Sequence, residues 1–362
     1  MNCFDLYIIL KDSEWMASEK NLVFIKNNIR CNNKFIVSSK NIKAKIEKEG
    51  FLFLDENNVL EGLSINSVKE LLKENGIEEK NAGWYLQQFI KYSISYISKN
   101  KYYLVWDADT IPLSPIDFFD KENHPYFNLK REYFKYYFDF IENSLGIKKI
   151  IDESFISEHM IFNSDIVIEI MKKIDEKSNE NSSSGKNFWK AIIECNLKDK
   201  NVNQRFFSEF ETYGTYVENN YPELYKKRKM RTLRSGATFF SFDFNRDIAE
   251  WLSKDFDTIS FEKWASPIQS SIRKIQNAEY RKKISAAKHI RKTAQNIKQK
   301  YILAIFTRNF KKAQKIQAII GSFSFDFFFE DWTCYVRARK LSKTSLPYRI
   351  FRKVQKILLR GI

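Results

Sequence analysis

Short apolar runs alternate with charged stretches through the first part of the chain. Residues 4–10, 34–39 and 50–55 are compact apolar runs, which is typical of buried β-strands. The charged stretch at residues 41–49 predicts a short helix between the second and third runs. Strands that alternate with helices at this spacing form βαβ units, so the pattern predicts an α/β fold with a largely parallel sheet.

The same alternation continues into the middle of the chain. Residues 67–75 and 84–97 predict two helices, and residues 101–106 predict a compact strand. That strand runs directly into Asp107. Open α/β sheets bind their ligands at the carboxyl ends of such strands, so the residues after position 106 are candidates for a site.

Beyond residue 150 the alternation of apolar runs and charged stretches is less regular. We expect a strand at 155–163, a helix at 165–176, a loop at 177–186, the start of a helix at 207–216 and a last strand at 237–244. Beyond residue 264 the composition changes. The sequence therefore predicts two parts, a catalytic domain at 1–264 and a basic, amphipathic, mainly helical region at 265–362.

The predicted second part is strongly cationic. The 362 residues have a net charge of +16, and residues 271–362 hold 23 Lys and Arg against 4 Asp and Glu. Residues 1–270 are close to neutral, with 38 basic and 41 acidic side chains. Such asymmetry indicates an anionic partner for the C-terminal region, either nucleic acid or an acidic membrane surface.

Apolar residues recur at helical spacing within this basic region. They are Ile284, Ala287, Ile290, Ala294, Ile297 and Tyr301, and residues 346–359 repeat the pattern after an aromatic stretch at 321–332. Nucleic-acid arms need only the charge, whereas a helix lying on a membrane needs both features. We therefore expect attachment to an anionic membrane surface and no nucleic-acid partner. Packing of the stripe within the protein, or a coiled coil, is the alternative.

The chain carries no basic, apolar leader at its start, and its four cysteines are scattered. No run approaches the length of a membrane-spanning helix. These features predict a cytoplasmic protein that is peripheral to the inner face of the cell membrane.

Two aspartates follow the strand at 101–106. Asp107 and Asp109 lie one residue apart, so both can project toward one pocket. Carboxylate oxygens are preferred ligands of Mg²⁺ and Mn²⁺, and a bound divalent cation can neutralise the charge that develops on a diphosphate leaving group. The pair therefore indicates a metal-dependent transferase that uses a nucleotide sugar. A solvated turn is the alternative for the tripeptide alone.

Glu209 and Glu211 are the candidates for a general base, which takes the proton of an attacking acceptor hydroxyl. Two residues apart on a helix, they face different directions, and we favour Glu209. Acidic residues after Ser208 also suit an ordinary helix N-terminus. Arg231 and Arg234 are candidates for a diphosphate clamp or for a solvated basic loop.

Four motifs occur in a fixed order. They are Gly-Trp-Tyr-Leu-Gln-Gln-Phe at 83–89, Tyr-Leu-Val-Trp-Asp-Ala-Asp-Thr-Ile-Pro-Leu at 103–113, Ser-Glu-His-Met at 157–160 and Ser-Glu-Phe-Glu-Thr-Tyr-Gly at 208–214. Over about residues 1–245 the chain resembles a bacterial GT-A glycosyltransferase-like family, the DUF6492 group. The resemblance implies a GT-A-like, Rossmann-type mixed sheet, mainly parallel and flanked by helices. It also implies transfer of a sugar to a glycan or lipid-linked saccharide in capsule or lipopolysaccharide synthesis.

The resemblance also implies roles for particular residues. Asp109 would hold Mn²⁺ or Mg²⁺, with Asp107 near the ribose or the metal's water. The helix at 84–91 would lie beside the donor pocket, with Gln87, Gln88 and Lys91 as polar contacts, or present the two glutamines on an exposed face. Lys11 and Asp12 would approach the nucleotide base, or belong to an ordinary loop.

Glu158 and His159 lie in a strand that is expected to line the sugar pocket, so they are candidates for contacts with the sugar or the acceptor. A structural role is the alternative for His159. Two other functions compete with glycosyl transfer. One is nucleotidyl transfer on a similar fold, and the other is nucleic-acid binding through the basic region.

Overall fold

The computed structural model describes residues 3–178, 184–195, 205–240, 245–262, 266–307 and 309–323. The chain divides into two compact units. The first comprises residues up to Ala108 together with Ile116–Lys130 and Phe134–Lys229. The second comprises Asp109–Pro115, Arg131–Tyr133 and the chain from Met230 onward. This division by contacts groups two short early segments and the chain from Met230 with the later part. The expected catalytic domain at 1–264 and C-terminal region at 265–362 stay a prediction.

A five-stranded sheet forms the centre of the first unit, in the order β3-β2-β1-β4-β7. Its strands are β1 (Phe4–Ile9), β2 (Lys34–Ser38), β3 (Leu52–Asp55), β4 (Tyr102–Trp106) and β7 (His159–Asn163). The first four are mutually parallel, and β7 pairs antiparallel with β4 so that Trp106 lies opposite His159. The predicted mixed, mainly parallel α/β fold is confirmed. The strand expected at 155–163 begins only at His159.

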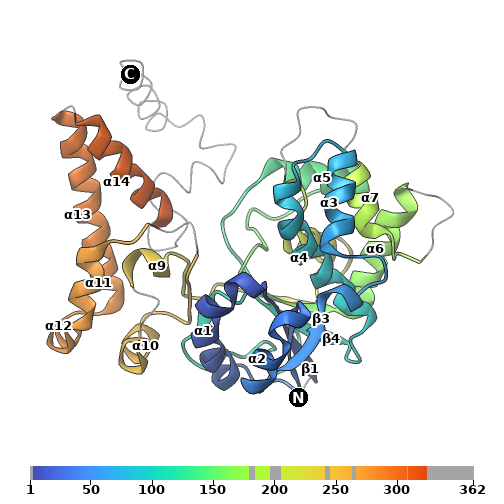
Figure 1. The fold of residues 1–362 in the computed structure, drawn as a ribbon, viewed down its shortest axis with the longest axis horizontal. Coiled ribbons are helices and arrows are strands. Elements are labelled where there is room, and N and C mark those ends of the chain that lie inside the picture. Colours follow the sequence, from blue (N-terminus) through green and yellow to red (C-terminus); the bar gives the residue numbers. More distant parts are fainter. Residues whose placement is uncertain are drawn as a thin grey trace. The chain divides into compact units, whose positions relative to one another are not determined.

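Helices cover both faces of this sheet (Figure 1). They are α1 (Trp15–Asn28), α2 (Lys43–Lys48), α3 (Ile65–Glu74), α4 (Ala82–Ser93), α5 (Lys135–Leu145), α6 (Ser164–Ser178), α7 (Phe188–Glu194) and α8 (Glu209–Asn220). Alternate strand residues point to opposite faces. Accordingly Tyr102, Leu104 and Trp106 pack with α1 and α2, whereas Tyr103 and Val105 pack with α3 to α8. The core therefore has two layers, one on each face.

Helix α8 is buried along almost its whole length. Gly214 lies where the ring of Phe155 approaches the helix so closely that no Cβ could be accommodated without movement. Phe127, Phe162 and Tyr213 surround the same region with further ring contacts. Burial of apolar area on this scale stabilises the fold, since each fully buried large side chain contributes about 1.5–3 kcal/mol. A small two-stranded sheet, β6 (Tyr126–Asn128) with β8 (Lys226–Arg228), completes the unit.

The second unit contains a three-stranded sheet and a set of helices. The sheet has the order β5-β10-β9, formed by β5 (Thr110–Pro112), β10 (Thr258–Ser260) and β9 (Thr232–Leu233). The helices are α9 (Gly236–Phe239), α10 (Arg246–Ser253), α11 (Gln269–Gln276), α12 (Ala278–Lys283), α13 (Ala286–Phe306) and α14 (Phe310–Phe323). The strand expected at 237–244 is wrong for its first residues, which form α9, and residues 241–244 lie outside the described part. Gly236 fits there because the carbonyl of Ser260 leaves no space for a side chain.

The predicted basic amphipathic helix is confirmed as α13. Its buried side chains include Ile290, Ala294 and Ile297, as the spacing predicted. Of the predicted loop at 177–186, residues 177–178 end α6 and residues 179–183 lie outside the described part. The amphipathic segment 346–359 and all but the first residues of the aromatic stretch 321–332 also lie outside it. Within the described residues, no helix is both long and apolar enough to cross a membrane.

Candidate active site

Asp107 is placed by the end of β4 in the first unit. The strand is buried throughout, and the chain leaves it with the amide of Asp107 donating a hydrogen bond to the carbonyl of Glu158 at 2.9 Å. The half-buried carboxylate accepts a hydrogen bond from Nζ of Lys91 at 3.1 Å. An acidic side chain therefore stands at the carboxyl end of a central strand, as the sequence predicted.

Lys91 links this aspartate to a distant segment. It lies in the last turn of α4, is almost fully buried, and donates from Nζ to Oε1 of Glu209 at 2.7 Å. Its ammonium group also lies 4.3 Å from the centre of the Phe210 ring. Burial alone would lower the pKa of Lys91, but the Asp107 and Glu209 carboxylates together outweigh it and raise the pKa. Lys91 therefore remains a buried cation between two carboxylates.

Glu209 is held by its backbone as well as by its side chain. Its amide donates to Oε1 of Gln88 at 3.2 Å, and its carbonyl accepts from the hydroxyl of Tyr92 at 2.8 Å. Ser208 caps the helix by accepting from the amide of Glu211 at 3.3 Å, which is why α8 begins at Glu209. The structure thus brings Gln88, Lys91, Asp107 and Glu209 together, and we call these four residues the Lys91 cluster.

Glu211 faces a different direction from Glu209, as expected for residues two apart on a helix. It is fully buried, and it pairs with Nζ of Lys149 at 3.0 Å. Its other oxygen accepts from the hydroxyl of Ser154 at 2.6 Å and from the amide of Phe155 at 3.1 Å. These contacts tie α8 to the 149–155 segment and give Glu211 a structural role. Its role as a base stays a prediction that these contacts do not favour.

Glu158 and His159 are both buried, and each has its own partners. Glu158 forms a buried ion pair with Lys130 at 3.2 Å. The ring of His159 stacks on Trp106 with a centroid distance of 4.8 Å and meets Phe118 edge-on. Burial, together with nearby Arg228 and Lys130, lowers the pKa of His159 far below its ordinary value, so the ring is neutral. His159 therefore packs as a core residue on Trp106, and contacts of Glu158 and His159 with a sugar or an acceptor stay a prediction.

Asp109 belongs to the second unit, at the entry to β5. Its carbonyl accepts from the amide of Phe261 at 2.9 Å, which fixes its backbone beside β10. The side chain is half-buried, and the hydroxyl of Thr110 lies 3.4 Å from its Oδ1. Asp107 and Asp109 are thus positioned by different sheets, although a single alanine separates them.

Arg231 and Arg234 both face carboxylates within the second unit. The guanidinium of Arg231 lies 2.6 Å from Oδ1 of Asp257, and that hydrogen bond is the main reason why its pKa is raised. Arg234 pairs with Glu132 and, at 2.8 Å, with Glu262. Both side chains therefore have acidic partners, and their contact with a diphosphate stays a prediction.

The residues expected near the nucleotide base lie at the carboxyl ends of β1 and β2. Nζ of Lys11 lies directly over Gly83, next to the start of α4. Asp12 accepts from the Ser39 hydroxyl at 2.6 Å and from the Asn41 amide group at 2.9 Å. The bond from Ser39 contributes most to lowering the pKa of Asp12. Gln87 is half-buried on α4.

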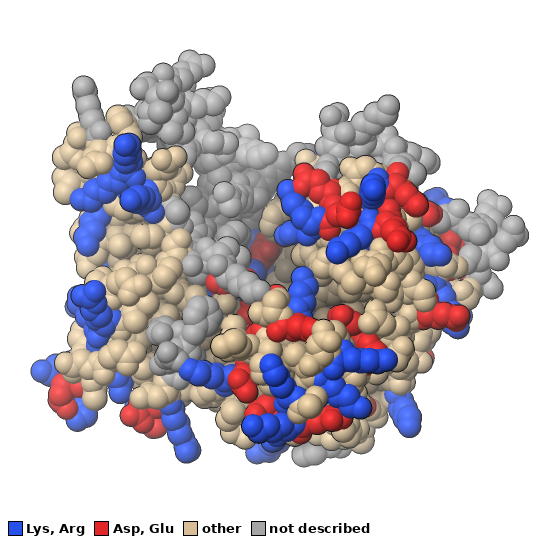
Figure 2. All heavy atoms as spheres, viewed as in Figure 1, with Lys and Arg blue, Asp and Glu red and all other residues tan. Residues whose placement is uncertain are grey.

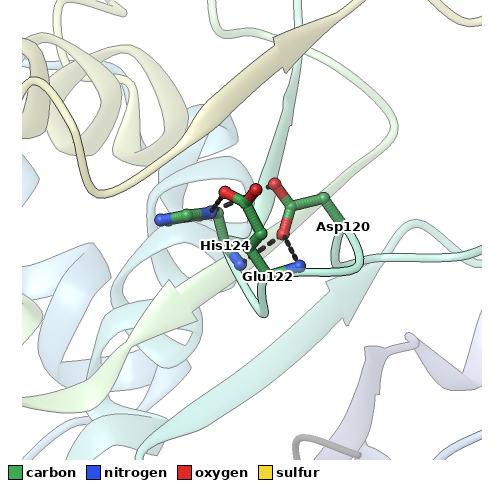
Figure 3. A group of neighbouring side chains, drawn as sticks. All are labelled: Asp120, Glu122 and His124. Atoms are coloured by element: carbon green, nitrogen blue, oxygen red, sulfur yellow. Dashed lines mark hydrogen bonds and ion pairs between the residues drawn. The ribbon is translucent and has the colours of Figure 1, made fainter.

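A group that could hold a metal ion lies elsewhere in the first unit, and the sequence interpretation missed it. Ligand atoms of Asp120, Glu122 and His124 lie within 4.8 Å of one another in one turn (Figure 3). Asp120 accepts from the amides of Glu122 and His124, at 2.9 and 2.8 Å, and its other oxygen lies 3.1 Å from Nδ1 of His124. The Asp-x-Glu-x-His spacing around one of only three histidines is the signal that could have revealed it. The hydrogen bonds account for the turn without a ligand.

Comparison of the sequence with protein-family models finds no match, and comparison with curated proteins finds none either, so the resemblance to the DUF6492 group is not confirmed. Among solved structures, the chain is similar to apo mouse xyloside xylosyltransferase 1, with 10% identity and a TM-score of 0.39 over 72% of this chain and 98% of that one. It is also similar to the WbbM bifunctional glycosyltransferase, with 12% identity and a TM-score of 0.37 over 73% of this chain and 47% of that one. A third similar structure is the glycosyltransferase GlyE of Streptococcus pneumoniae TIGR4, with 10% identity and a TM-score of 0.35 over 73% of this chain and 55% of that one. The chain spans about half the length of the last two, and the likenesses are too distant to carry a functional argument.

Proposed function

We propose that the protein is a glycosyltransferase of the GT-A type, which moves a sugar from a nucleotide-sugar donor to a saccharide or lipid-linked acceptor in the synthesis of a bacterial surface polysaccharide. The observation that carries the proposal is the Lys91 cluster. It places a buried Lys between the acid at the end of β4 and the candidate base at the start of α8. Perturbed ionisable groups at a sheet's carboxyl edge are typical of a catalytic site. The resemblance of the four sequence motifs adds to this argument.

Glu209 is the proposed base. Lys91 engages its Oε1, so Oε2 is the oxygen that we assign to the acceptor hydroxyl. In the proposed step, Oε2 takes the hydroxyl proton while the hydroxyl oxygen bonds to the anomeric carbon of the donor. The bond between that carbon and the phosphate oxygen breaks, and its electron pair leaves with the nucleoside diphosphate. This step inverts the configuration of the sugar.

We propose Asp109 as the principal ligand of a divalent cation, with Asp107 near the donor's ribose or the metal's water. Carboxylate oxygens suit Mn²⁺ or Mg²⁺. Lys91 already neutralises Asp107 in part, which favours Asp109 for the cation. When bound, such an ion would stabilise the negative charge of the diphosphate leaving group.

The remaining polar residues supply proposed contacts with the donor. Lys91 and Gln88 belong to the cluster itself, and Gln87 lies on the same helix. Lys11 and Asp12 are proposed near the nucleotide base because they follow β1 at the same edge of the sheet. Arg231 and Arg234 would have to exchange their carboxylate partners for phosphate. The basic C-terminal region, predicted from residue 265, is proposed to attach the protein to an anionic membrane surface at the inner face of the cell membrane.

A screen of nucleotide sugars tests the proposal, with and without Mn²⁺. We expect one or a few nucleotide sugars to raise the thermal unfolding temperature, because a ligand that binds the folded state stabilises it. Slow hydrolysis of the same sugar should release a nucleoside diphosphate. Release of pyrophosphate from a nucleoside triphosphate would instead show a nucleotidyltransferase. Absence of any stabilisation or turnover with all common nucleotide sugars would refute glycosyl transfer.

A further inference from the structure

Helix α13 ends in three large apolar side chains that are exposed to water. The exposed fractions of Ile302, Leu303 and Phe306 are 52%, 60% and 81%. Residues three and four apart lie side by side on a helix, so the three form one continuous surface. We call these residues the hairpin tip, because the chain turns directly after them into α14. Exposed clusters of this kind mark sites of interaction.

The hairpin tip is held in a defined geometry. The amide of Thr307 donates to the carbonyl of Leu303 at 2.9 Å, and the amide of Asn309 donates to the carbonyl of Ala304 at 2.8 Å. The side chain of Asn309 then caps α14 by accepting from the amide of Lys312 at 3.1 Å. Hydrogen bonds therefore hold the carbonyls of Leu303 and Ala304 in the last turn of α13, and α14 begins after a capping side chain.

The tip is separate from the apolar stripe that the sequence revealed on the same helix. The stripe residues Ile290, Ala294 and Ile297 are buried within the second unit. That stripe therefore serves packing, which was the alternative interpretation of its periodicity. Among the described residues of α13, those of the hairpin tip are the exposed large apolar side chains.

The charge around the hairpin tip is positive, which indicates an anionic partner. The two helices and their turn, residues 286–323, contain nine Lys and Arg and no Asp or Glu. In the view of Figure 2, basic side chains lie on the α13 and α14 region without acidic ones among them. Lys300, Lys311 and Lys312 flank the tip on its two sides in the sequence, and all three are exposed. Cations flanking exposed apolar side chains match an anionic lipid interface, which takes up both.

We propose that the hairpin tip inserts into an anionic lipid bilayer, with Lys300, Lys311 and Lys312 at the level of the headgroups. A nucleic acid would satisfy the cations, but its phosphate backbone would leave Phe306 in water. The inference rests on the proposed membrane attachment and not on glycosyl transfer. It names the part of the C-terminal region that enters the membrane.

Vesicle co-sedimentation tests the proposal with the full-length chain. The vesicles contain equal parts of phosphatidylglycerol and phosphatidylcholine, and pure phosphatidylcholine serves as the neutral comparison. We expect Ile302→Gln/Leu303→Gln/Phe306→Gln to reduce the partition coefficient about tenfold or more, since glutamine keeps the helix but not the apolar surface. In a second variant, Lys300→Gln/Lys311→Gln/Lys312→Gln, each lost cation should reduce binding roughly fivefold at low salt.

The matched control is Met16→Gln/Val23→Gln on α1, whose side chains are 86% and 51% exposed but lie outside the basic region. It should bind vesicles like the unaltered protein. Equal binding by the tip variant and the unaltered protein would overturn the inference, while leaving attachment through other residues intact. Binding to neutral vesicles alone, or to RNA and not to vesicles, would overturn both the inference and the membrane attachment. Circular dichroism establishes that each variant is folded.

Discussion

Nζ of Lys91 lies 2.7 Å from Oε1 of Glu209, although 118 residues separate the two in the chain. Both side chains are buried, so the pair joins the end of α4 to the start of α8 inside the first unit. Removing one partner of such a pair leaves an uncompensated buried charge. A substitution in the Lys91 cluster can therefore change both the activity and the free energy of unfolding, so each variant needs a measurement of both.

The first prediction concerns Glu209. Glu209→Gln should bind the nucleotide sugar but transfer it about 10²–10⁴-fold more slowly, because a positioned base contributes a factor of that size. Donor affinity by calorimetry and kcat by product release measure the two effects. Lys91 keeps Asp107 as a charged partner and can still bond to the amide oxygen, so the cluster should survive.

The matched control is Glu211→Gln. Because Glu211 is fully buried against Lys149, Ser154 and Phe155, this variant should lose about 3–5 kcal/mol of the free energy of unfolding. Its kcat per folded molecule should change little. If Glu211→Gln lost kcat and Glu209→Gln did not, the assignment of the base would be wrong. If neither affected kcat, a retaining mechanism would be the better hypothesis.

The second prediction concerns the metal. Asp109→Asn should abolish Mn²⁺-dependent donor binding and activity while leaving the thermal unfolding curve of the apo protein nearly unchanged. His124→Ala removes a nitrogen from the other group that could hold an ion and should keep Mn²⁺-dependent activity. The reverse pattern would place the functional ion in the 120–124 turn.

The third prediction concerns the cation of the cluster. Lys91→Met should shift the acidic limb of the pH profile of kcat to higher pH, because a buried carboxylate without its cation takes up a proton more readily. It should also cost about 3–5 kcal/mol of stability. Lys149→Met breaks the neighbouring pair with Glu211 and should cost similar stability without moving the pH profile. If the unaltered protein, Lys91→Met and Lys149→Met had the same pH profile of kcat, Lys91 would not be the cation that keeps the catalytic carboxylate ionised.

A buried histidine in the second unit has fully determined hydrogen bonds. The hydroxyl of Ser271 donates to the carbonyl of Phe239 at 3.0 Å, so it must accept from Nε2 of His289 at 2.7 Å. Nδ1 of His289 then accepts from the hydroxyl of Tyr280 at 2.9 Å. Burial and nearby Lys274 lower the pKa of His289 from 6.5 to about 4. The network thus joins α11, α12 and α13 through a neutral ring.

The fourth prediction follows from this pKa. The unfolded chain binds a proton at His289 near pH 6.5 and the folded protein only near pH 4. The contribution of neutral His289 to the free energy of unfolding should therefore be complete above pH 6.5. It should fall as the pH is lowered toward 4, by about 3 kcal/mol in all, at about 1.4 kcal/mol per pH unit. Denaturant unfolding between pH 7 and 4 measures it. His289→Asn should lack this component, and an equally steep loss in that variant would assign the acid sensitivity to other groups.

The local pattern of the sequence was sufficient for the parallel strands and for the long helices. The runs at β1, β2 and β4 are apolar because both faces of these strands are covered, and α13 repeats its buried residues every three or four positions. Both are properties of neighbouring residues, which a sequence shows directly. The strand prediction for 237–244 was wrong for its first residues because a short apolar run fits a strand or a helical turn equally well.

The candidate site divides in the same way. The sequence by itself determined that Asp107 ends a buried strand and that Glu209 and Glu211 begin a helix in different directions. Only the tertiary structure decided that Lys91 joins Asp107 to Glu209, that Lys149 occupies Glu211, and that His159 packs on Trp106. Strand and helix periodicity depends on adjacent residues, whereas the partner of a buried charge depends on which distant segments share one layer of the core. That choice is made by packing and electrostatics together, and no local pattern encodes it.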